Sequence, residues 1–373
     1  MTAANTTTDN LIYLLGCAIK NEKADAARVS SMDLSELYRL SRSHMVTSAV
    51  AYALESAGVK DDNFVQAKAK AQRKTALMDA DMTVVIGELE AAGIWHMPLK
   101  GAILKDLYPG FGMRQMSDRD ILVDPDRMAD VKKIMLSAGF KPAYVGQGED
   151  DSYHKAPVSN FEMHHRLFGA THDSRLEEYY KDVKSRLIKN EGDGYGYHFS
   201  SEDFYIYLLA HEYKHYSAGG IGIRSLSDTY LYLKKYGNDL DFEYIASETE
   251  KLGIGEFEEL NRRLSLALFD GASLDEEEER MYRYMLGSGT YGNLGNNFRN
   301  KIKKQEKKRF PRLAYIWRRV FLPLSVVKSV FPVFYKYPIL LPFLPFYRLI
   351  RGLLFNRKKL KNEAKLLRGY KRK

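Results

Sequence analysis

Two aspartates separated by one residue, at the start of an apolar run, constrain this chain most. Asp118 and Asp120 come just before Ile121, Leu122 and Val123, and such a run is typical of a β-strand. Because side chains alternate across a strand, both carboxylates are expected on the same face. Two carboxylates held side by side can bind a pair of Mg²⁺ ions, which align an attacking oxygen with a phosphoryl group. The pattern therefore predicts a metal site at this strand.

The residues upstream predict a turn that approaches phosphate. Residues 94–99 are expected to form a short strand, Lys100 and Gly101 a turn, and residues 102–108 a helix that ends before Pro109. A glycine between a strand and a helix lets the backbone approach a phosphate, and the helix start offers unpaired N–H groups. Lys100, Gly101 and the N–H groups that follow are therefore predicted to hold a triphosphate.

This order of strand, glycine turn, helix and Asp-x-Asp strand resembles the polymerase-β-like nucleotidyltransferase superfamily. More closely, the chain resembles a bacterial nucleotidyltransferase family with the motif Leu-Lys-Gly, Leu-Tyr-Pro, Arg, and Asp-x-Asp-x-Leu-Val. The matching residues are Leu99, Lys100, Gly101, Leu107, Tyr108, Pro109, Arg114, Asp118, Asp120, Leu122 and Val123. The resemblance covers about residues 35–350 and is specific in this central motif.

The resemblance implies transfer of a nucleoside monophosphate from a nucleoside triphosphate to a hydroxyl or phosphate acceptor. Asp118 and Asp120 would hold two Mg²⁺ ions, and Arg114 and Ser117 would join Lys100 in binding the nucleotide. The acceptor stays open: a protein, a sugar or a small molecule. The base of the nucleotide is open as well.

Two residues depart from the superfamily pattern. Ala102 stands where glycine or serine is usual, which removes one phosphate contact. Arg119 stands between the two acids, where an apolar residue is usual, on the sheet face that packs against a helix. An arginine there must be paired or reach water. These departures leave open a catalytically inactive relative that only binds a nucleotide or a partner.

Residues 158–167 offer a third carboxylate on a second expected strand. Glu162 and His164 alternate there with apolar side chains, so one face of the strand is polar. Since the superfamily places a third acid on a neighbouring strand, Glu162 is the candidate third metal ligand and general base. His164 is predicted to bind an acid or a phosphate. The alternative for His164 and His165 is a solvent-facing strand.

A predicted helix over residues 200–215 carries two histidines four residues apart. His211-Glu212-x-x-His215 matches the zinc-protease signature, which places both imidazoles on one helix face. A zinc protease also needs a third ligand, and none follows at the spacing of the extended motif. A zinc metalloprotease is kept as a remote alternative.

The resemblance includes a histidine-rich helix, a glycine turn and an Arg…Asp pair in the same order. Residues 219–222 supply the turn, and Arg224 and Asp228 supply the pair. The implied ligands of the triphosphate or the acceptor are His211, Lys214 or His215, together with Arg224. Since Arg224 and Asp228 lie at i, i+4, the alternative is that they only pair with each other.

Strand–helix alternation is confined to residues 91–170, which are expected to form the α/β core. Residues 1–90 and 171–300 are expected to be helical, and residues 301–373 to form a basic, apolar C-terminal segment. The helices expected in the first region cover residues 10–21, 33–57 and 63–92, with Gly58 and Gly93 as stops. The predicted fold class is α+β, with a small mixed-sheet nucleotidyltransferase core embedded in helical N- and C-terminal regions.

Charge separates the C-terminal segment from the rest of the chain. The chain carries a net charge of +9, and residues 301–373 contain 22 Lys and Arg against 2 Glu, a net of +20 that leaves −11 on residues 1–300. Residues 320–346 are apolar and aromatic, but their prolines argue against a membrane-spanning helix. Residues 303–373 are predicted either to lie on an anionic membrane surface or to pack on the acidic body. No nucleic-acid fold motif accompanies them, so no specific nucleic acid is expected.

The number of cysteines and the N-terminal sequence indicate the cellular compartment in which the protein is expected. The single cysteine, Cys17, cannot form an internal disulfide, which suits a reducing cytosol. The N-terminus shows no signal-peptide pattern. The expected location is cytoplasmic, with peripheral attachment to the inner membrane face as a variant.

Overall fold

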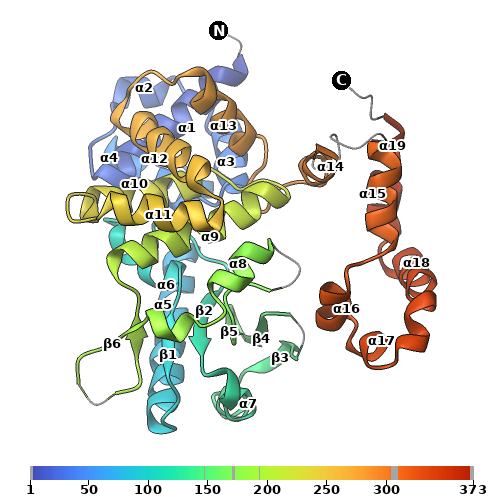
Figure 1. Ribbon diagram of the computed structural model, residues 1–373. Coiled ribbons are helices and arrows are strands. Elements are labelled where there is room, and N and C mark those ends of the chain that lie inside the picture. Colours follow the sequence, from blue (N-terminus) through green and yellow to red (C-terminus); the bar gives the residue numbers. More distant parts are fainter. Residues whose placement is uncertain (1–2, 147, 170–172, 193, 304–309, 370–373) are drawn as a thin grey trace.

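The computed structural model describes residues 3–146, 148–169, 173–192, 194–303 and 310–369 of the 373-residue chain. Figure 1 shows a helical layer at the top, a sheet with its covering helices below it, and a C-terminal group of helices at the right. The sheet has five strands, and a two-stranded ribbon accompanies it. The predicted α+β class with a small mixed sheet is confirmed.

Five helices precede the sheet and largely follow the predicted pattern. They are α1 (Ala3–Lys20), α2 (Ala26–Ser30), α3 (Leu34–Ser43), α4 (Thr47–Ser56) and α5 (Asp62–Ala91). The single helix expected over residues 33–57 is wrong, because Met45 takes a left-handed φ of 54° and ends α3. The break turns His44 into the core, where it is fully buried. Apolar spacing continues across the break, so periodicity alone indicated one helix.

The sheet is mixed, with β2 and β5 parallel at its centre. Its strands are β1 (His96–Pro98), β2 (Arg119–Val123), β3 (Lys141–Tyr144), β4 (Asp150–Lys155) and β5 (Ser159–His164), in the order β1-β2-β5-β4-β3. The other neighbouring strands are antiparallel. In the parallel register Asp120 lies beside Glu162, and Leu122 beside His164.

The two faces of the sheet differ in chemistry. Ile121, Val123, Phe161 and Met163 belong to one apolar cluster with residues of α5 and α7 (Met128–Ser137). Because side chains alternate along each strand, the opposite face of β2 and β5 carries their polar residues. The apolar face anchors the strands, and the polar face is free to form a site.

Arg119 lies on the apolar face and is paired there. Its side chain is 1% exposed, and its guanidinium binds Asp79 of α5. A second contact runs from Nη1 to the sulfur of Met116 at 3.2 Å. Of the two expected arrangements, pairing within the protein or reaching water, the structure shows the pairing, and Arg119 links β2 to α5.

Helices after the sheet cover its polar face. Between β5 and the ribbon lie α8 (Ser174–Tyr179) and η3 (Val183–Arg186), and the ribbon is β6 (Ile188–Lys189) with β7 (Tyr197–His198). The helices that follow are α9 (Ser201–Ala218), α10 (Arg224–Tyr236), α11 (Phe242–Leu252), α12 (Gly255–Asp270) and α13 (Glu276–Leu286). The Ser200 hydroxyl accepts from the N–H of Asp203 at 3.1 Å and so caps α9.

The chain ends in a run of short helices. They are α14 (Leu294–Lys303), α15 (Pro311–Val320), α16 (Leu324–Val330), α17 (Pro332–Lys336), η4 (Pro338–Phe343), α18 (Leu344–Phe355) and α19 (Arg357–Gly369). We call residues 311–369 the C-terminal arm. One stretch, Pro338–Phe355, is long and apolar enough to cross a membrane by length and composition, and 6% of it is buried. The stretch is exposed in this structure, and both alternatives for residues 303–373, an anionic membrane surface and packing on the acidic body, stay predictions.

Candidate functional site

A cavity of about 380 Å³ lies between the polar face of the sheet and helices α9 and α10. Every residue predicted for catalysis or nucleotide binding lines it: Lys100, Gly101, Arg114, Ser117, Asp118, Asp120, Glu162, His164, His211, His215 and Arg224. Its size is typical of a small-molecule site. The fold therefore gathers separate sequence segments in one place, while the chemical role of each residue stays a prediction.

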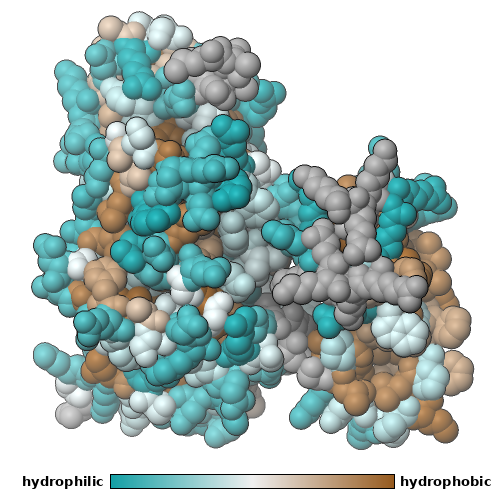
Figure 2. Space-filling view, turned by 45° about the horizontal axis from the view of Figure 1, so that its top comes forward, coloured by the Kyte–Doolittle hydropathy of each residue, from teal (hydrophilic) through white to brown (hydrophobic). Residues whose placement is uncertain are grey.

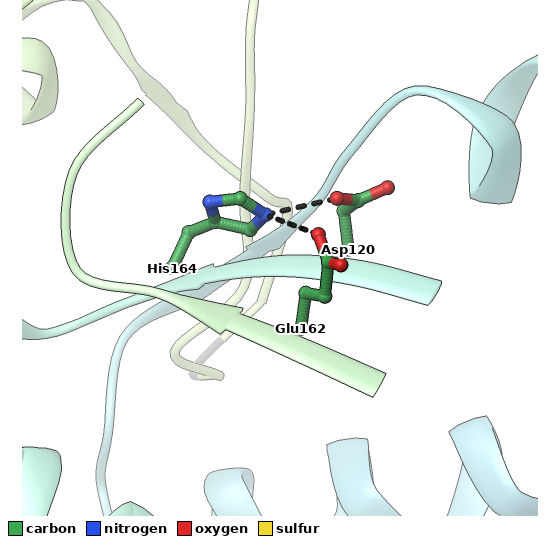
Figure 3. Close-up of side chains that lie close together, drawn as sticks. All are labelled: Asp120, Glu162 and His164. Carbon is green, nitrogen blue, oxygen red and sulfur yellow. Dashed lines mark hydrogen bonds and ion pairs between the residues drawn. The ribbon is translucent and has the colours of Figure 1, made fainter. Parts of the chain in front are cut away.

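Three side chains converge on one wall of the cavity. Asp120, Glu162 and His164 each offer one ligand atom, and these atoms lie within 4.8 Å of one another (Figure 3). Nε2 of His164 is 2.9 Å from Oδ1 of Asp120 and 3.6 Å from Oε2 of Glu162. Two carboxylates and an imidazole are donors that a divalent cation accepts. The parallel register of β2 and β5 creates this group.

The two aspartates of the motif occupy different electrostatic environments. Asp118 precedes β2 and lines the same cavity, where burial and the charges of Asp120 and Glu162 raise its pKa to about 6. Burial also acts to raise the pKa of Asp120, but Lys100 and His164 outweigh it and hold that pKa well below its usual range. Nearby cations therefore neutralise the charge of Asp118 less than they neutralise the charge of Asp120. An under-neutralised carboxylate of this kind is expected beside a cation site.

Lys100 supplies the cation that Asp120 meets in this structure. Its Nζ lies 2.7 Å from Oδ1 of Asp120, and its side chain is 15% exposed. Burial acts to lower the pKa of Lys100, but the charge of Asp120 prevails and raises it. The Lys100 backbone takes a φ of 43°, an unusual conformation for a residue with a side chain. The turn thus aims this ammonium at the acidic wall.

The turn after Lys100 differs from the prediction. The expected helix over residues 102–108 is a four-residue α6 (Gly101–Leu104) followed by the 3₁₀ helix η1 (Lys105–Leu107). The N–H groups of Ala102 and Ile103 donate to backbone carbonyls three residues back, at 3.1 and 3.0 Å. These two N–H groups are therefore already paired within the turn, and the phosphate-binding role expected for Gly101 and the N–H groups after it stays a prediction. Gly101 is needed for packing, since a Cβ there would lie 2.6 Å from Nη1 of Arg114.

Arg114 is held by a buried bidentate ion pair. Its Nε and Nη2 donate to the two carboxylate oxygens of Asp228 at 2.7 and 2.8 Å, and the Tyr108 hydroxyl donates to the same carboxylate at 2.8 Å. All three residues are buried. Arg224 instead donates to the backbone carbonyl of Gln115. The alternative that Arg224 only pairs with Asp228 is therefore wrong, because Arg114 occupies that carboxylate.

Basic side chains form the opposite wall. His211, Lys214 and His215 project from one face of α9, and the Nε2 atoms of the two histidines are 3.2 Å apart. Burial, and then the charge of Lys100, lower the pKa values of His211 and Lys214. Burial and Arg114 likewise lower the pKa of Arg224. Crowded donors of this kind favour an anionic ligand.

Glu212, the acid of the zinc-protease signature, is buried and lines the same cavity. Its Oε2 accepts from Asn261 at 3.1 Å, and the residue is 2% exposed. Within the described ranges, the one group of three or more metal-ligating side chains is that of Asp120, and it includes neither His211 nor His215. The geometry gives the zinc-protease alternative neither a third ligand nor a positioned acid.

The structure adds residues that the sequence reasoning missed. Glu149 and Asp150 line the cavity, and Asp150 lies opposite His164 in the β4–β5 register. The acidic run before β4 was the signal that could have placed them there. Tyr291, from the loop after α13, contacts Ser117 with 2.6 Å between the two hydroxyl oxygens. No local pattern links these two residues, which lie 174 positions apart.

A second cavity of about 470 Å³ adjoins the first. His215 and Tyr291 line both cavities. The second one lies between the end of α9, the loop after α13, and helices α14, α15 and α19. The shared residues make the two spaces neighbours, so a second molecule could lie beside a ligand of the first cavity.

Comparison with known proteins gives one match. Residues 30–270 match a family model described as uncharacterised nucleotidyltransferase. No curated protein and no solved structure matches the chain. The matched segment contains every residue predicted for the site.

Proposed function

The chain belongs to the uncharacterised nucleotidyltransferase family, and from that premise we propose a specific reaction. It moves a nucleoside monophosphate from a nucleoside triphosphate to a hydroxyl or phosphate acceptor and releases pyrophosphate. The observation that carries this proposal is the cavity itself, which sets an acidic wall on the sheet against a wall of basic side chains on α9 and α10. Such walls suit a metal-bound triphosphate.

The acidic wall fits two Mg²⁺ ions. Asp118 and Asp120 would hold both ions, and Glu162 would complete one of the two sites. The fit rests on the donors present: the ligand atoms of Asp120, Glu162 and His164 converge, and the Asp118 carboxyl is raised in pKa by burial and by its acidic neighbours. Bound Mg²⁺ would supply charge stabilisation to the phosphates and to the attacking oxygen.

The remaining residues position the substrates. Lys100, now on Asp120, would turn toward the triphosphate, and Arg224 with the α9 cations would orient it. Glu162 would accept the proton of the acceptor hydroxyl. His164 would keep Asp120 in place through its 2.9 Å contact. The adjoining cavity, reached past His215 and Tyr291, gives the acceptor a place.

Label transfer tests the proposal. The full chain would be incubated with MgCl₂, each labelled nucleoside triphosphate in turn and a cell lysate, and the labelled product identified. We expect one product with pyrophosphate release, abolished by EDTA, restored by Mg²⁺ and absent in Asp118→Asn. The matched control Asp126→Asn changes an exposed aspartate outside the cavity and should leave transfer intact. Binding of Mg-ATP without turnover of any nucleotide would instead favour the inactive relative.

Metal analysis of the purified protein distinguishes the zinc-protease alternative from the proposed nucleotidyl transfer. We expect no stoichiometric zinc in the purified chain, and no loss of transfer with a zinc-selective chelator. One zinc per chain that disappears in His211→Ala would overturn the assignment of His211 and His215 to the nucleotide or the acceptor.

A further inference from the structure

The C-terminal arm exposes the side chains that proteins normally bury. Ile339 is 82% exposed, Phe355 77% and Leu354 71%, and Phe343, Phe346 and Trp317 are also exposed. Figure 2 shows hydrophobic colours gathered over the lobe at the right, which is this arm. Soluble surfaces rarely carry so many neighbouring large apolar side chains, and such a surface marks an interaction site.

The same arm is strongly basic. Residues 311–369 contain 13 Lys and Arg against 1 Glu, a net charge of +12, and Glu363 is the single acidic residue after position 310. Glu363 is already occupied, because Arg319 donates to it at 2.9 Å. Exposed basic residues such as Arg351, Arg357 and Lys358 lie on α18 and α19 beside the apolar side chains. The surface therefore offers cations and apolar groups together.

We propose that the C-terminal arm docks on an anionic lipid bilayer and lies in its interface. A bilayer takes both features of the arm, since its headgroups meet the cations and its acyl boundary meets the apolar side chains. A nucleic acid would meet the cations but leave the apolar side chains in water. A second copy of the chain would bring two arms of net charge +12 together.

The geometry favours an interfacial position over a spanning one. Pro342 and Pro345 divide the apolar stretch into η4, of 6 residues, and α18, of 12 residues. Arg348 and Arg351 also lie on α18, and Arg348 donates to the carbonyl of Val320 at 2.9 Å. Both features suit a helix that lies along the surface.

Vesicle flotation of the full chain tests the docking without any need for turnover. The probes are vesicles of phosphatidylcholine with phosphatidylglycerol and vesicles of phosphatidylcholine alone. We expect the chain to float with the anionic vesicles at low salt and to stay behind with the neutral ones. Salt should release it, because screening weakens the attraction of each basic residue. Alkaline carbonate should release it too, as it does for peripheral proteins.

Two pairs of substitutions locate the contact. Leu353→Glu with Leu354→Glu removes exposed apolar side chains, and Arg351→Glu with Arg357→Glu reverses charge. Each pair should weaken partitioning to anionic vesicles by at least about tenfold. The matched controls Leu136→Glu and Lys132→Glu change exposed residues of α7 and should not alter it. A thermal melt confirms that each variant is folded.

Several results would overturn the proposal. Retention in the membrane after carbonate would show a spanning segment. Equal binding to neutral vesicles, no binding to either kind, or capture of RNA or DNA in preference to vesicles would each remove anionic lipid as the partner. An equal loss in the α7 controls would exclude the arm as the contact. A chain that floats but transfers no nucleotide would leave the docking intact and count only against the proposed reaction.

Discussion

The cavity of the candidate site and the C-terminal arm depart from ordinary burial in opposite directions. The cavity buries charge: Asp120 is 4% exposed, and Arg114 with Asp228 lies behind it at 7% and 4%. The arm exposes apolar surface, with Leu354 and Phe355 more than two-thirds accessible. Each arrangement is costly in water unless something compensates for it.

The difference lies in what compensates each region. The buried charges of the cavity meet partners within the chain, as Asp120 meets Lys100 and Arg114 meets Asp228. The exposed apolar side chains of the arm have no such cover in the described part of the chain. The cavity should therefore respond to mutation in both stability and activity. The arm should respond in membrane binding while the fold barely changes.

The largest expected effects come from replacing the two aspartates of the motif, which should both abolish activity but differ in their effect on stability. Asp118→Asn removes a charge that lies among like charges, so label transfer should fall by at least about a thousandfold while the melting temperature holds or rises. Asp120→Asn should lose as much activity. It should also destabilise the fold by about 3 kcal/mol, because it leaves the ammonium of Lys100 without its buried partner. Initial rates and urea unfolding of both variants measure the contrast.

Asp126→Asn is the control for both rate and unfolding, since this exposed residue lies outside the cavity. Near-normal transfer by a folded Asp118→Asn would rule out the proposed metal site. Equal stability of Asp118→Asn and Asp120→Asn would contradict the inference that Asp120 is neutralised by Lys100 while Asp118 is not.

Local patterns sufficed to predict part of this site. Alternation along β2 and β5 placed Asp120, Glu162 and His164 on one face and Arg119 on the other, because strand periodicity depends on neighbouring residues alone. The helical face of α9 likewise placed His211 and His215 together.

Other features depend on a contact between distant segments or on the backbone conformation of single residues. Arg114 meets Asp228 across 114 positions, and no local spacing could show that this pair displaces the i, i+4 partner Arg224. The break at Met45 is set by a single left-handed residue within continuous apolar spacing. The N–H of Ala102 turns back to a nearby carbonyl because α6 is only four residues long. A contact between distant segments decides the first feature, and the other two depend on local backbone conformations that periodicity does not record.

The next prediction compares one ion pair from each region. Arg114→Ala leaves Asp228 buried without its partner and should destabilise the fold by about 3–5 kcal/mol. Arg319→Ala removes the arm's pair with Glu363, whose side chains are 42% and 22% exposed, and should cost less than about 1 kcal/mol. Urea unfolding monitored by circular dichroism gives both values. Equal losses would mean that the arm is as tightly built as the cavity.

A smaller effect, on the pH dependence of stability, is expected from His44, which contacts the residue before α10. Its Nδ1 accepts from the N–H of Ile223, and burial lowers its pKa to about 4. The unfolded state therefore binds the proton more readily, so stability should fall as pH drops below the unfolded pKa. Between pH 7 and pH 5 the loss from this residue should be about 2 kcal/mol.

Urea unfolding at the two pH values measures this loss. His44→Asn keeps an acceptor near the Nδ1 position and should remove that part of the pH dependence, although it lowers stability at pH 7. His154→Asn changes an exposed histidine and should leave the pH dependence unaltered. The same slope in His44→Asn and in the unchanged chain would contradict the assignment.

The smallest expected change tests the arm directly. Leu354→Ser alters a side chain that is 71% exposed, so the free energy of unfolding should stay within about 0.5 kcal/mol of the original value. Leu209→Ala, at a fully buried position of α9, should cost about 2–5 kcal/mol and calibrates the measurement. A loss above 1 kcal/mol for Leu354→Ser would show that its side chain packs within the protein in solution. The arm would then belong to the core, and its apolar surface would no longer call for a lipid partner.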